Sequence, residues 1–493
     1  WRYPFQLLSR PVARGPWVAE GWFKPPFDGQ SAHLNPPVAN IGSGPSGVAA
    51  YPGTGLSNHY DGRFFMVDFR GTASSSGIHS FRLERRGAGF RLVDREDFIW
   101  NLLATDFGFG TDGAMYATDW VHGWDGVGQG RVWRFTDEAG AEEAAGTAAV
   151  LQAGFSSRSS RDLEGLLGHA DRRVRLGAQW ELAARGAGDV LGRAARSDRR
   201  LLARLHGVWG LGHLARESDR DHGRVLLGLA RDGVPEIRAA AVRCLSEVPG
   251  IECTALLAEL LKDASPPVQL EAALAVGRVG RRWALEDVMQ LLEETGDSDP
   301  WLRHGAVMAL TGLGRREPGL LDRPATSDSA AVRMGALLAM RRLEDPRITH
   351  FLADTAPLLV VEAARAIWDA PVKAAWPALA DLAGSADGRA RLAAGPEALW
   401  RRVRAAAQAV GRDEDAAALV SWVGDDSLPV SAQRIALEVL ATWADPPDRD
   451  PVVGNWRPLA PRDASAAQAA TLALIDRLQD TPLATLAPSV GRA

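Results

Sequence analysis

A pattern that recurs nine times after Ser160 restricts the fold of this chain more than any other feature. In each copy a polar residue, often Asp, precedes a Val/Ile-Arg-x-x-Ala core and a run of small apolar residues. The copies lie at 171–178, 204–211, 234–241, 267–273, 300–306, 331–336, 360–364, 403–407 and 430–436. Their Val or Ile positions are about 29 to 34 residues apart, with one longer step between Val361 and Val403. A repeat of this length predicts one helix pair per copy, stabilised by stacking on its neighbours.

The pattern inside each copy agrees with helices. Asp or Ser stands where its side chain can cap the second helix of a pair, as Asp171 does. Val, Ala and Leu at helical spacing fill the seam between neighbours, and small Ala and Gly residues let helices approach closely. The period and pattern resemble HEAT repeats. We therefore predict a HEAT-repeat α-solenoid over residues 159–444. A Pro-rich break, a last helix at 464–478 with Asp463 as its N-cap, and a tail make up residues 445–493.

A different periodicity precedes residue 137. Residues 60–71 and 106–120 each read as a Gly-containing turn, a short apolar strand and a terminal Asp, which is Asp68 in the first and Asp119 in the second. Each is followed by a further strand candidate, at 77–84 and 130–135. Short strands at regular spacing with repeated turn signals favour a sheet-repeat fold such as a β-propeller. The Gly-rich run at 41–48 has no Lys and no following helix, so it reads as a turn between strands rather than a phosphate loop.

Several motifs in this region together resemble one known propeller. They lie at 35–47, 51–53, 64–71, 76–81 and 111–124. Their combination is similar to the end of the propeller in the planctomycete-type membrane-bound dehydrogenases, which resemble quinoprotein glucose/sorbosone dehydrogenases. The resemblance implies the C-terminal blades of a six-bladed β-propeller over residues 1–137, with HEAT repeats following and a c-type cytochrome domain after them. The Cys-x-x-Cys-His of such a domain is not in this chain, and both ends look cut, so we expect a fragment.

The resemblance also suggests site residues at the strand ends. Asp119 and His122 would be catalytic, because an Asp and a His placed together suit removal of a proton from a sugar alcohol. Arg70 and Trp124 would bind pyrroloquinoline quinone (PQQ), and Asp68 would bind calcium. The alternative is structural: Asp at a strand end often caps the next turn, and Trp packs between sheets. The family's catalytic base and most quinone contacts are expected on earlier blades, which this chain lacks.

Composition excludes several classes of function. The net charge of -5 argues against a nucleic-acid binder, and no run of about 18 apolar residues predicts a transmembrane helix. Cys244 and Cys253 match no zinc or haem motif, and we expect two buried thiols rather than a disulfide. The histidines of the helical part match no metal-ligand spacing.

Two further segments and two functions are predicted. Residues 1–37 are rich in Trp, Phe and Pro, and are either an extended segment pinned by its rings or a linker. Residues 138–158 are predicted to be a linker between the two domains. The first function is the C-terminal part of a PQQ-dependent sugar or alcohol dehydrogenase, periplasmic by resemblance, whose solenoid docks a protein or cytochrome. The alternative is a non-catalytic propeller on a HEAT scaffold that binds a protein or glycan. In either case we expect this piece alone to be inactive as an enzyme.

Overall fold

The computed structural model describes residues 15–25, 27–126, 128–216, 220–279 and 281–478. It divides into two compact units, one made of residues 38–291 and the other of residues 1–37 together with 292–493. Trp1 and the tail at 479–493, on which predictions were made, lie outside the described residues. The predicted domain at 1–137 differs from this division, because its first 37 residues belong with the C-terminal helices.

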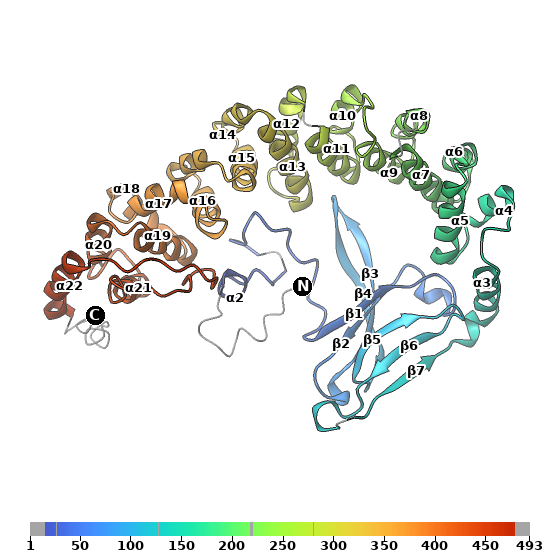
Figure 1. Cartoon of the computed structure of the whole chain (residues 1–493), viewed down its shortest axis with the longest axis horizontal. Coiled ribbons are helices and arrows are strands. Elements are labelled where there is room, and N and C mark those ends of the chain that lie inside the picture. The colour runs from blue at the N-terminus through green and yellow to red at the C-terminus, as the bar shows by residue number, and fades with distance from the viewer. Residues whose placement is uncertain (1–14, 26, 127, 217–219, 280, 479–493) are drawn as a thin grey trace. The chain divides into compact units, whose positions relative to one another are not determined.

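The first unit opens with two small antiparallel sheets (Figure 1). One sheet has the order β1-β2-β3-β4, and the other has the order β5-β6-β7. The strands are β1 (Pro45–Ala50), β2 (Phe64–Asp68), β3 (Gly77–Arg86), β4 (Gly89–Trp100), β5 (Ala104–Phe109), β6 (Met115–Asp119) and β7 (Arg131–Phe135). The strands predicted at 77–84 and 130–135 and the two that end at Asp68 and Asp119 are confirmed. Strands β4 and β5 were not predicted, and β1 begins inside the Gly-rich run at 41–48, which was predicted to be a turn.

The two sheets share one apolar core rather than forming a closed propeller. Phe65 and Ile78 from the first sheet and Met115 and Ala117 from the second are buried in the same cluster. Aromatic rings extend this cluster, with Phe65 edge-on to Phe109 at a centroid distance of 5.6 Å. The predicted C-terminal blades of a six-bladed propeller are therefore replaced by two small sheets, of four and three strands, that bury their apolar faces in a common core.

Helices follow the sheets without a break. Residues 138–158, predicted as a linker, contain the helix α3 (Ala141–Ala153), because an Ala-rich stretch free of Pro favours a helix. The remaining helices of this unit are α4 (Ser160–Leu166), α5 (Arg172–Ala184), α6 (Gly188–Ser197), α7 (Leu201–Arg216), α8 (Arg220–Leu229), α9 (Pro235–Leu245), α10 (Thr254–Leu260) and α11 (Pro266–Val279). Asp171 caps α5 as predicted, and its other oxygen accepts a hydrogen bond from Thr54 at 2.9 Å, which ties the sheet region to the first repeat.

After α12 (Leu285–Thr295), where the division falls, the second unit continues the helix pairs. Its helices are α13 (Pro300–Arg316), α14 (Asp322–Ala325), α15 (Ala330–Leu343), α16 (Pro357–Asp369), α17 (Trp376–Asp381), α18 (Ala386–Ala394), α19 (Glu397–Val410), α20 (Asp413–Val420), α21 (Val430–Leu440) and α22 (Ser465–Leu478). Two helices, α17 and α18, stand between α16 and α19, which explains the longer step between Val361 and Val403. The last helix is confirmed, and Asp463 accepts a hydrogen bond from the backbone N–H of Ser465 at 3.0 Å.

The recurring Arg of the repeat joins consecutive helix pairs. Arg238 donates to both carboxylate oxygens of Asp263, at 2.8 and 2.7 Å, and to the carbonyl of Asp232. Asp263 in turn accepts from the N–H of Ser265, just before α11. Arg333 and Asp354 repeat this arrangement before α16. In these two repeats, the Arg of the pattern thus bonds to the residue that caps the next helix.

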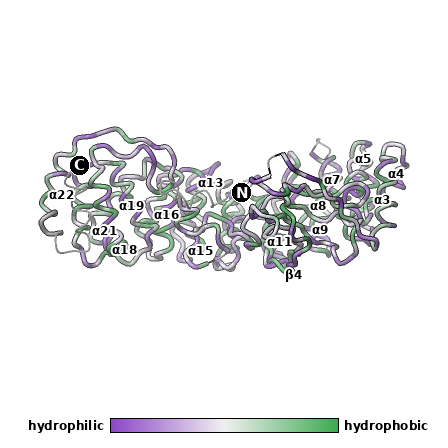
Figure 2. Tube along the Cα trace, turned by 90° about the horizontal axis from the view of Figure 1, so that it is seen from below, coloured by the Kyte–Doolittle hydropathy of each residue, from purple (hydrophilic) through white to green (hydrophobic). Residues whose placement is uncertain are grey.

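Hydrophilic and hydrophobic residues are mixed along the helices in Figure 2. Among the described residues, no helix is both long and apolar enough to cross a membrane. Cys244 and Cys253 are free thiols, as expected.

Candidate functional site

The five residues predicted for quinone chemistry lie at the ends of β2 and β6. Asp68, the predicted calcium ligand, is fully buried and already bound on several sides. It accepts hydrogen bonds from the backbone N–H of Gly44 at 2.8 Å and from Nε of Arg70 at 2.7 Å. Burial by itself raises the pKa of Asp68, but the bonds from Arg70 and Gly44 outweigh burial and hold the pKa below its usual range.

The Gly-rich run at 41–48 brings the backbone N–H of Gly44 to the carboxylate of Asp68. A Cβ on Gly44 would lie 1.5 Å from the carbonyl oxygen of Phe69, so only glycine lets the chain pass close enough to reach Asp68. His79 was not predicted as a site residue. It is buried, and it joins Asp97 at Nδ1 (2.7 Å) to Asp68 at Nε2 (3.4 Å). This cluster fastens β2 to β3 and β4, which is a structural role.

Asp119, the predicted catalytic acid or base, is also engaged. It accepts from the N–H of Val121 at 2.9 Å and from the indole N–H of Trp133 at 3.0 Å, and it pairs with Arg131 at 3.1 Å. The side chain of His122 is exposed, and Trp124 is 75% exposed. Trp120 stacks on Phe69 with centroids 6.1 Å apart, so the two strand ends do lie side by side.

The fold therefore brings these five residues to the adjacent ends of β2 and β6, but the carboxylates of Asp68 and Asp119 are already bound to other groups of the protein. Among the described residues, no group of three His, Cys, Asp or Glu side chains could hold a metal ion. The partners of the two carboxylates agree with the structural alternative: Asp119 fixes the turn after β6, and Asp68 holds Gly44 and Arg70 beside the end of β2. The roles predicted for PQQ and calcium stay predictions.

A more extensive arrangement lies in the second unit. Residues 15–37, described except for residue 26 and called the strap below, run along the helices α13, α15, α16 and α19 (Figure 1). The short helix α2 (Pro16–Ala19) begins the strap, and its remainder is extended or turned. Of the two states predicted for residues 1–37, the described part agrees with a segment pinned to its neighbours, although it is helical at 16–19 and largely turned rather than extended after that.

Glu20 of the strap lies between two buried arginines. One carboxylate oxygen accepts from Nη1 of Arg402 at 2.7 Å, and the other accepts from Nη2 of Arg365 at 2.7 Å. Arg402 also forms a two-bond fork with Asp369 at 2.8 and 2.6 Å. Burial alone lowers the pKa of Arg402, but Asp369 and Glu20 raise it well above its usual range. Arg402 therefore stays charged although it is buried.

The strap makes further contacts through two rings and one hydroxyl group. Trp22 is buried, and the guanidinium of Arg365 lies over its ring at 5.7 Å from the centroid. His33 meets Trp22 edge-on at 5.1 Å. Ser31 donates to Glu362 of α16 at 3.2 Å. We call Glu362, Arg365, Asp369 and Arg402 the strap face.

Sequence reasoning did not find the strap face, although a signal was present. Glu362 and Arg365 interrupt an otherwise apolar run, Val360 to Ile367. Charged residues inside such a run indicate buried ion pairs, because an unpaired buried charge is costly. The partner, Glu20, could not be found from sequence because it lies hundreds of positions away.

A second extended stretch packs on the same helices. Asp450 accepts from the indole N–H of Trp368 at 3.2 Å and pairs with Arg457 at 2.6 Å. Arg401 of α19 donates to the carbonyl of Pro451 at 3.3 Å. The Pro-rich break predicted after residue 445 is thus a second segment held by α16 and α19.

Comparison with known proteins agrees with the repeat. Residues 253–341 match the family model of HEAT repeats. No curated protein matches the chain. These findings support the HEAT prediction, and they give no support to the dehydrogenase resemblance of residues 35–135.

The chain is similar to several solved helical proteins at low identity. One is Kap95p, from a structure about its binding to RanGDP, at 12% identity and a TM-score of 0.43, covering 71% of this chain and 53% of that one. Another is Kap121p bound to the extreme C-terminus of the protein phosphatase Cdc14p, at 11% identity and a TM-score of 0.43, covering 71% and 47%. A third is the complex of CpcE and CpcF of phycocyanin lyase from Nostoc, at 18% identity and a TM-score of 0.26, covering 52% and 86%. The chain spans about half the length of the two karyopherins it matches. At such low scores these likenesses carry no argument about binding.

Proposed function

We propose that this protein is a scaffold that binds an extended polypeptide segment of a partner protein on the strap face of its C-terminal helices. The segment it suits carries a carboxylate next to a large aromatic ring. The observation that supports this proposal is the strap itself, which α16 and α19 hold through Glu20 and Trp22. A HEAT solenoid with such a face is suited to protein binding and has no need of a catalytic group.

The charges of the strap face explain why it selects an acidic segment. Besides Glu20, Arg365 pairs with Glu362 and Arg402 pairs with Asp369. Both of these acidic residues lie on α16. Without Glu20 the two guanidinium groups would have donors that no longer meet a carboxylate. Leaving a buried donor unpaired costs about 1–3 kcal/mol, and more for a charged group. The face is therefore stabilised by any segment that brings a carboxylate to the place of Glu20.

Contacts to the backbone of the strap explain why the segment should be extended. Nη2 of Arg365 donates to the carbonyl of Gly29 at 3.3 Å, in addition to Glu20. The backbone carbonyl of Pro451 in the second held stretch meets Arg401 in a comparable way. A chain without its own helix offers free carbonyls to such donors. The same helices thus hold two irregular stretches through both side chains and backbone.

The strap belongs to the same chain as the strap face, and it competes for this face with any segment of a partner protein. A tethered segment has an effective concentration in the millimolar range, so a partner must bind more tightly than the strap or meet a chain whose strap is released. This suggests that the strap occupies the face until a stronger segment displaces it.

A peptide-binding measurement tests the proposal. The full chain carrying Glu20→Gln and Trp22→Ala would have a weakened strap, and a fluorescein-labelled peptide of residues 15–37 would be titrated into it by fluorescence anisotropy. We expect the peptide to bind this double variant and to bind the unaltered chain at least tenfold more weakly. A peptide carrying Glu20→Gln should bind the double variant at least tenfold more weakly than the natural peptide, since the charge-assisted contacts to Arg365 and Arg402 are lost.

Matched controls distinguish binding at the strap face from non-specific binding of the peptide. Arg434→Gln, added to the double variant, removes an exposed arginine of α21 that pairs with Glu438, and it should leave peptide binding unchanged. Arg402→Gln in the same background should abolish binding. If the natural peptide shows no binding to a folded double variant up to ~100 µM, a Kd in the range of weak complexes, the proposal is wrong.

A further inference from the structure

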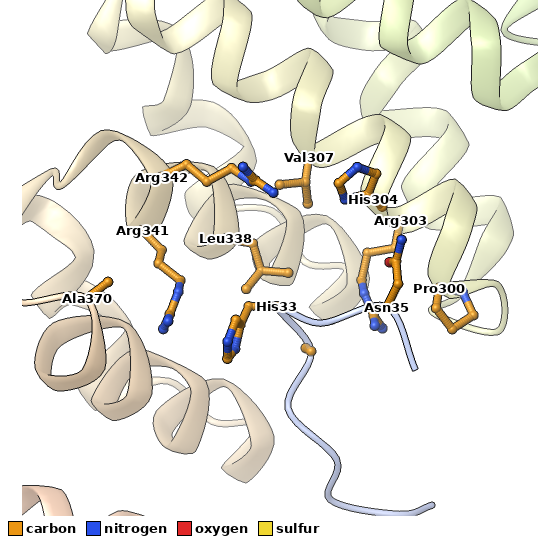
Figure 3. A pocket seen from close by; sticks show the side chains of 11 residues that line it. His33, Asn35, Pro300, Arg303, His304, Val307, Leu338, Arg341, Arg342 and Ala370 are labelled. Carbon is orange, nitrogen blue, oxygen red and sulfur yellow. The ribbon is translucent and has the colours of Figure 1, made fainter. Parts of the chain in front are cut away.

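A cavity lies beside the strap, between the helices α13 and α15. Its volume is about 280 Å³. Arg303 and His304 reach it from α13, Arg341 and Arg342 from α15, and His33 and Asn35 from the strap (Figure 3). Asn35, the two histidines and the three arginines supply hydrogen-bonding groups along its wall, and no carboxylate lines it.

Arg341, on the wall of the cavity, has a buried guanidinium that is not fully hydrogen-bonded. Its Nη1 atom is buried and has no hydrogen-bond partner among the described residues. The two carboxylates that raise the pKa of Arg341 are those of Asp369 and Glu362. However, Asp369 forms its fork with Arg402, and Glu362 pairs with Arg365. Burial lowers the pKa of Arg341, and these two carboxylates offset that effect only in part. Arg341 also lines the cavity, so an anion bound there would lie beside a guanidinium that its protein neighbours leave incompletely paired.

The neighbouring histidines add hydrogen bonds without adding charge. Burial, followed by the charges of Arg342 and Arg303, lowers the pKa of His304. Burial also lowers the pKa of His33, and its Nδ1 lies 2.5 Å from the hydroxyl oxygen of Ser31. Both rings are therefore neutral near pH 7, where each carries one N–H. Because the Ser31 hydroxyl donates to Glu362, the N–H of His33 is on Nδ1 and donates to Ser31, which leaves the N–H of His304 for a ligand in the cavity. The positive charge of the cavity comes from its arginines.

We propose that this cavity is a binding site for a phosphoryl group. Arginines from two helices approach one space from different sides, which suits an anion with several acceptor oxygens better than a carboxylate, which one arginine can satisfy alone. The cavity has room for the anion together with the first atoms of the group that carries it. The site is separate from the strap face and goes beyond the proposed scaffold function, although His33 and Asn35 make the strap one of its walls.

Isothermal titration calorimetry on the full chain tests this site. The probes are inorganic phosphate, a short peptide with one phosphoserine, the same peptide without phosphate, and acetate, at one fixed ionic strength. We expect phosphate or the phosphopeptide to bind with one site per chain, and acetate and the unmodified peptide to bind at least tenfold more weakly. Equal affinity for phosphate and phosphopeptide indicates a small phosphorylated molecule as the source. A phosphopeptide that binds tenfold more tightly than phosphate indicates a phosphorylated protein side chain.

Three variants locate the binding. Arg342→Gln changes an exposed residue and should fold normally, and we expect it to weaken binding tenfold or more. Arg341→Met should weaken it at least as much, with folding checked by circular dichroism. Arg315→Gln, at the exposed end of α13 and outside the cavity, is the matched control and should bind as the unaltered chain does. Unchanged binding in folded Arg342→Gln, equal binding of acetate and phosphate, or no binding of either phosphorylated probe would each overturn the proposal.

Discussion

Glu20 and Arg402 are 382 positions apart in the chain, and their side chains meet at 2.7 Å in the C-terminal unit. The Arg402 side chain is fully buried, and that of Glu20 is 8% exposed. A contact of such sequence separation fixes where the strap lies, and it makes the strap part of the same compact unit as the helices. It also gives the first of four predictions.

Replacing Glu20 by Gln should release the strap. Breaking a buried ion pair costs about 3–5 kcal/mol when the partner stays buried, but the strap can detach and let water reach the arginines, so the loss is limited to the free energy that holds the strap. Hydrogen exchange followed by mass spectrometry should show faster exchange across residues 16–25 while the helices are unchanged. Glu438→Gln, which removes an exposed pair with Arg434, is the control and should have little effect. Slow exchange of the strap in the Glu20 variant would show that its rings hold it without the carboxylate.

The bonds between repeats give the second prediction. Arg238→Gln removes the fork to Asp263 and the bond to the carbonyl of Asp232, and it should lower the free energy of unfolding by about 1–3 kcal/mol. Arg224→Gln, in an exposed pair on α8, should change it by less than about 0.5 kcal/mol. Urea unfolding followed by circular dichroism measures both. Similar losses in the two variants would mean that the fork adds nothing beyond a surface ion pair.

His206 makes the first unit sensitive to acid. This buried ring meets Oε1 of Gln179 at Nδ1 (2.7 Å), and its Nε2 accepts from Arg175 at 3.2 Å, which requires the neutral form. Burial, and then the charge of Arg175, lowers the pKa of His206 to about 4. The unfolded chain has a pKa near 6.5 and binds the proton first, so stability is complete above about pH 6.5 and is lost as pH falls toward 4.

The loss through His206 should approach about 3 kcal/mol at pH 4. Urea unfolding between pH 7 and pH 4 measures it, and His206→Gln should remove this part of the pH dependence while keeping a donor for Gln179. The nearby His169, whose pKa burial also lowers, contributes in both proteins, so the difference between them isolates His206. An unchanged pH dependence in the variant would show that folding does not lower the pKa of His206.

The fourth prediction concerns the dehydrogenase resemblance. The chain alone, given PQQ, calcium and an aldose with an electron-accepting dye, should show no turnover, because Asp68 and Asp119 are engaged in fixed hydrogen bonds. An active quinoprotein dehydrogenase assayed alongside is the positive control. Turnover that depends on PQQ and falls in His122→Ala would contradict the structural roles assigned to these strand ends.

The repeat and the strands could be predicted because their signals are local. Val174 and Ala178 lie one helical turn apart on the buried side of α5, and Asp171 caps the same helix. The turn before Met115 and the Asp that ends β6 are likewise contained in a few consecutive residues. The candidate sites were harder, because Asp68 and Asp119 have the same local pattern whether they bind a ligand or a neighbouring turn. Only their partners, Gly44 and Arg70 for the first and Trp133 for the second, decide between these roles.

The sequence by itself determined the helical repeat, several of the strands and the helix caps at Asp171 and Asp463, because each depends on side chains within one or two turns of one another. Tertiary structure alone decided that two small sheets share one core, that the first 37 residues join the last helices, and that Arg341 faces a cavity. Those features depend on the burial of charges and rings contributed by distant segments. Their stabilisation arises only when the chain has folded, so no local pattern records which segments will meet.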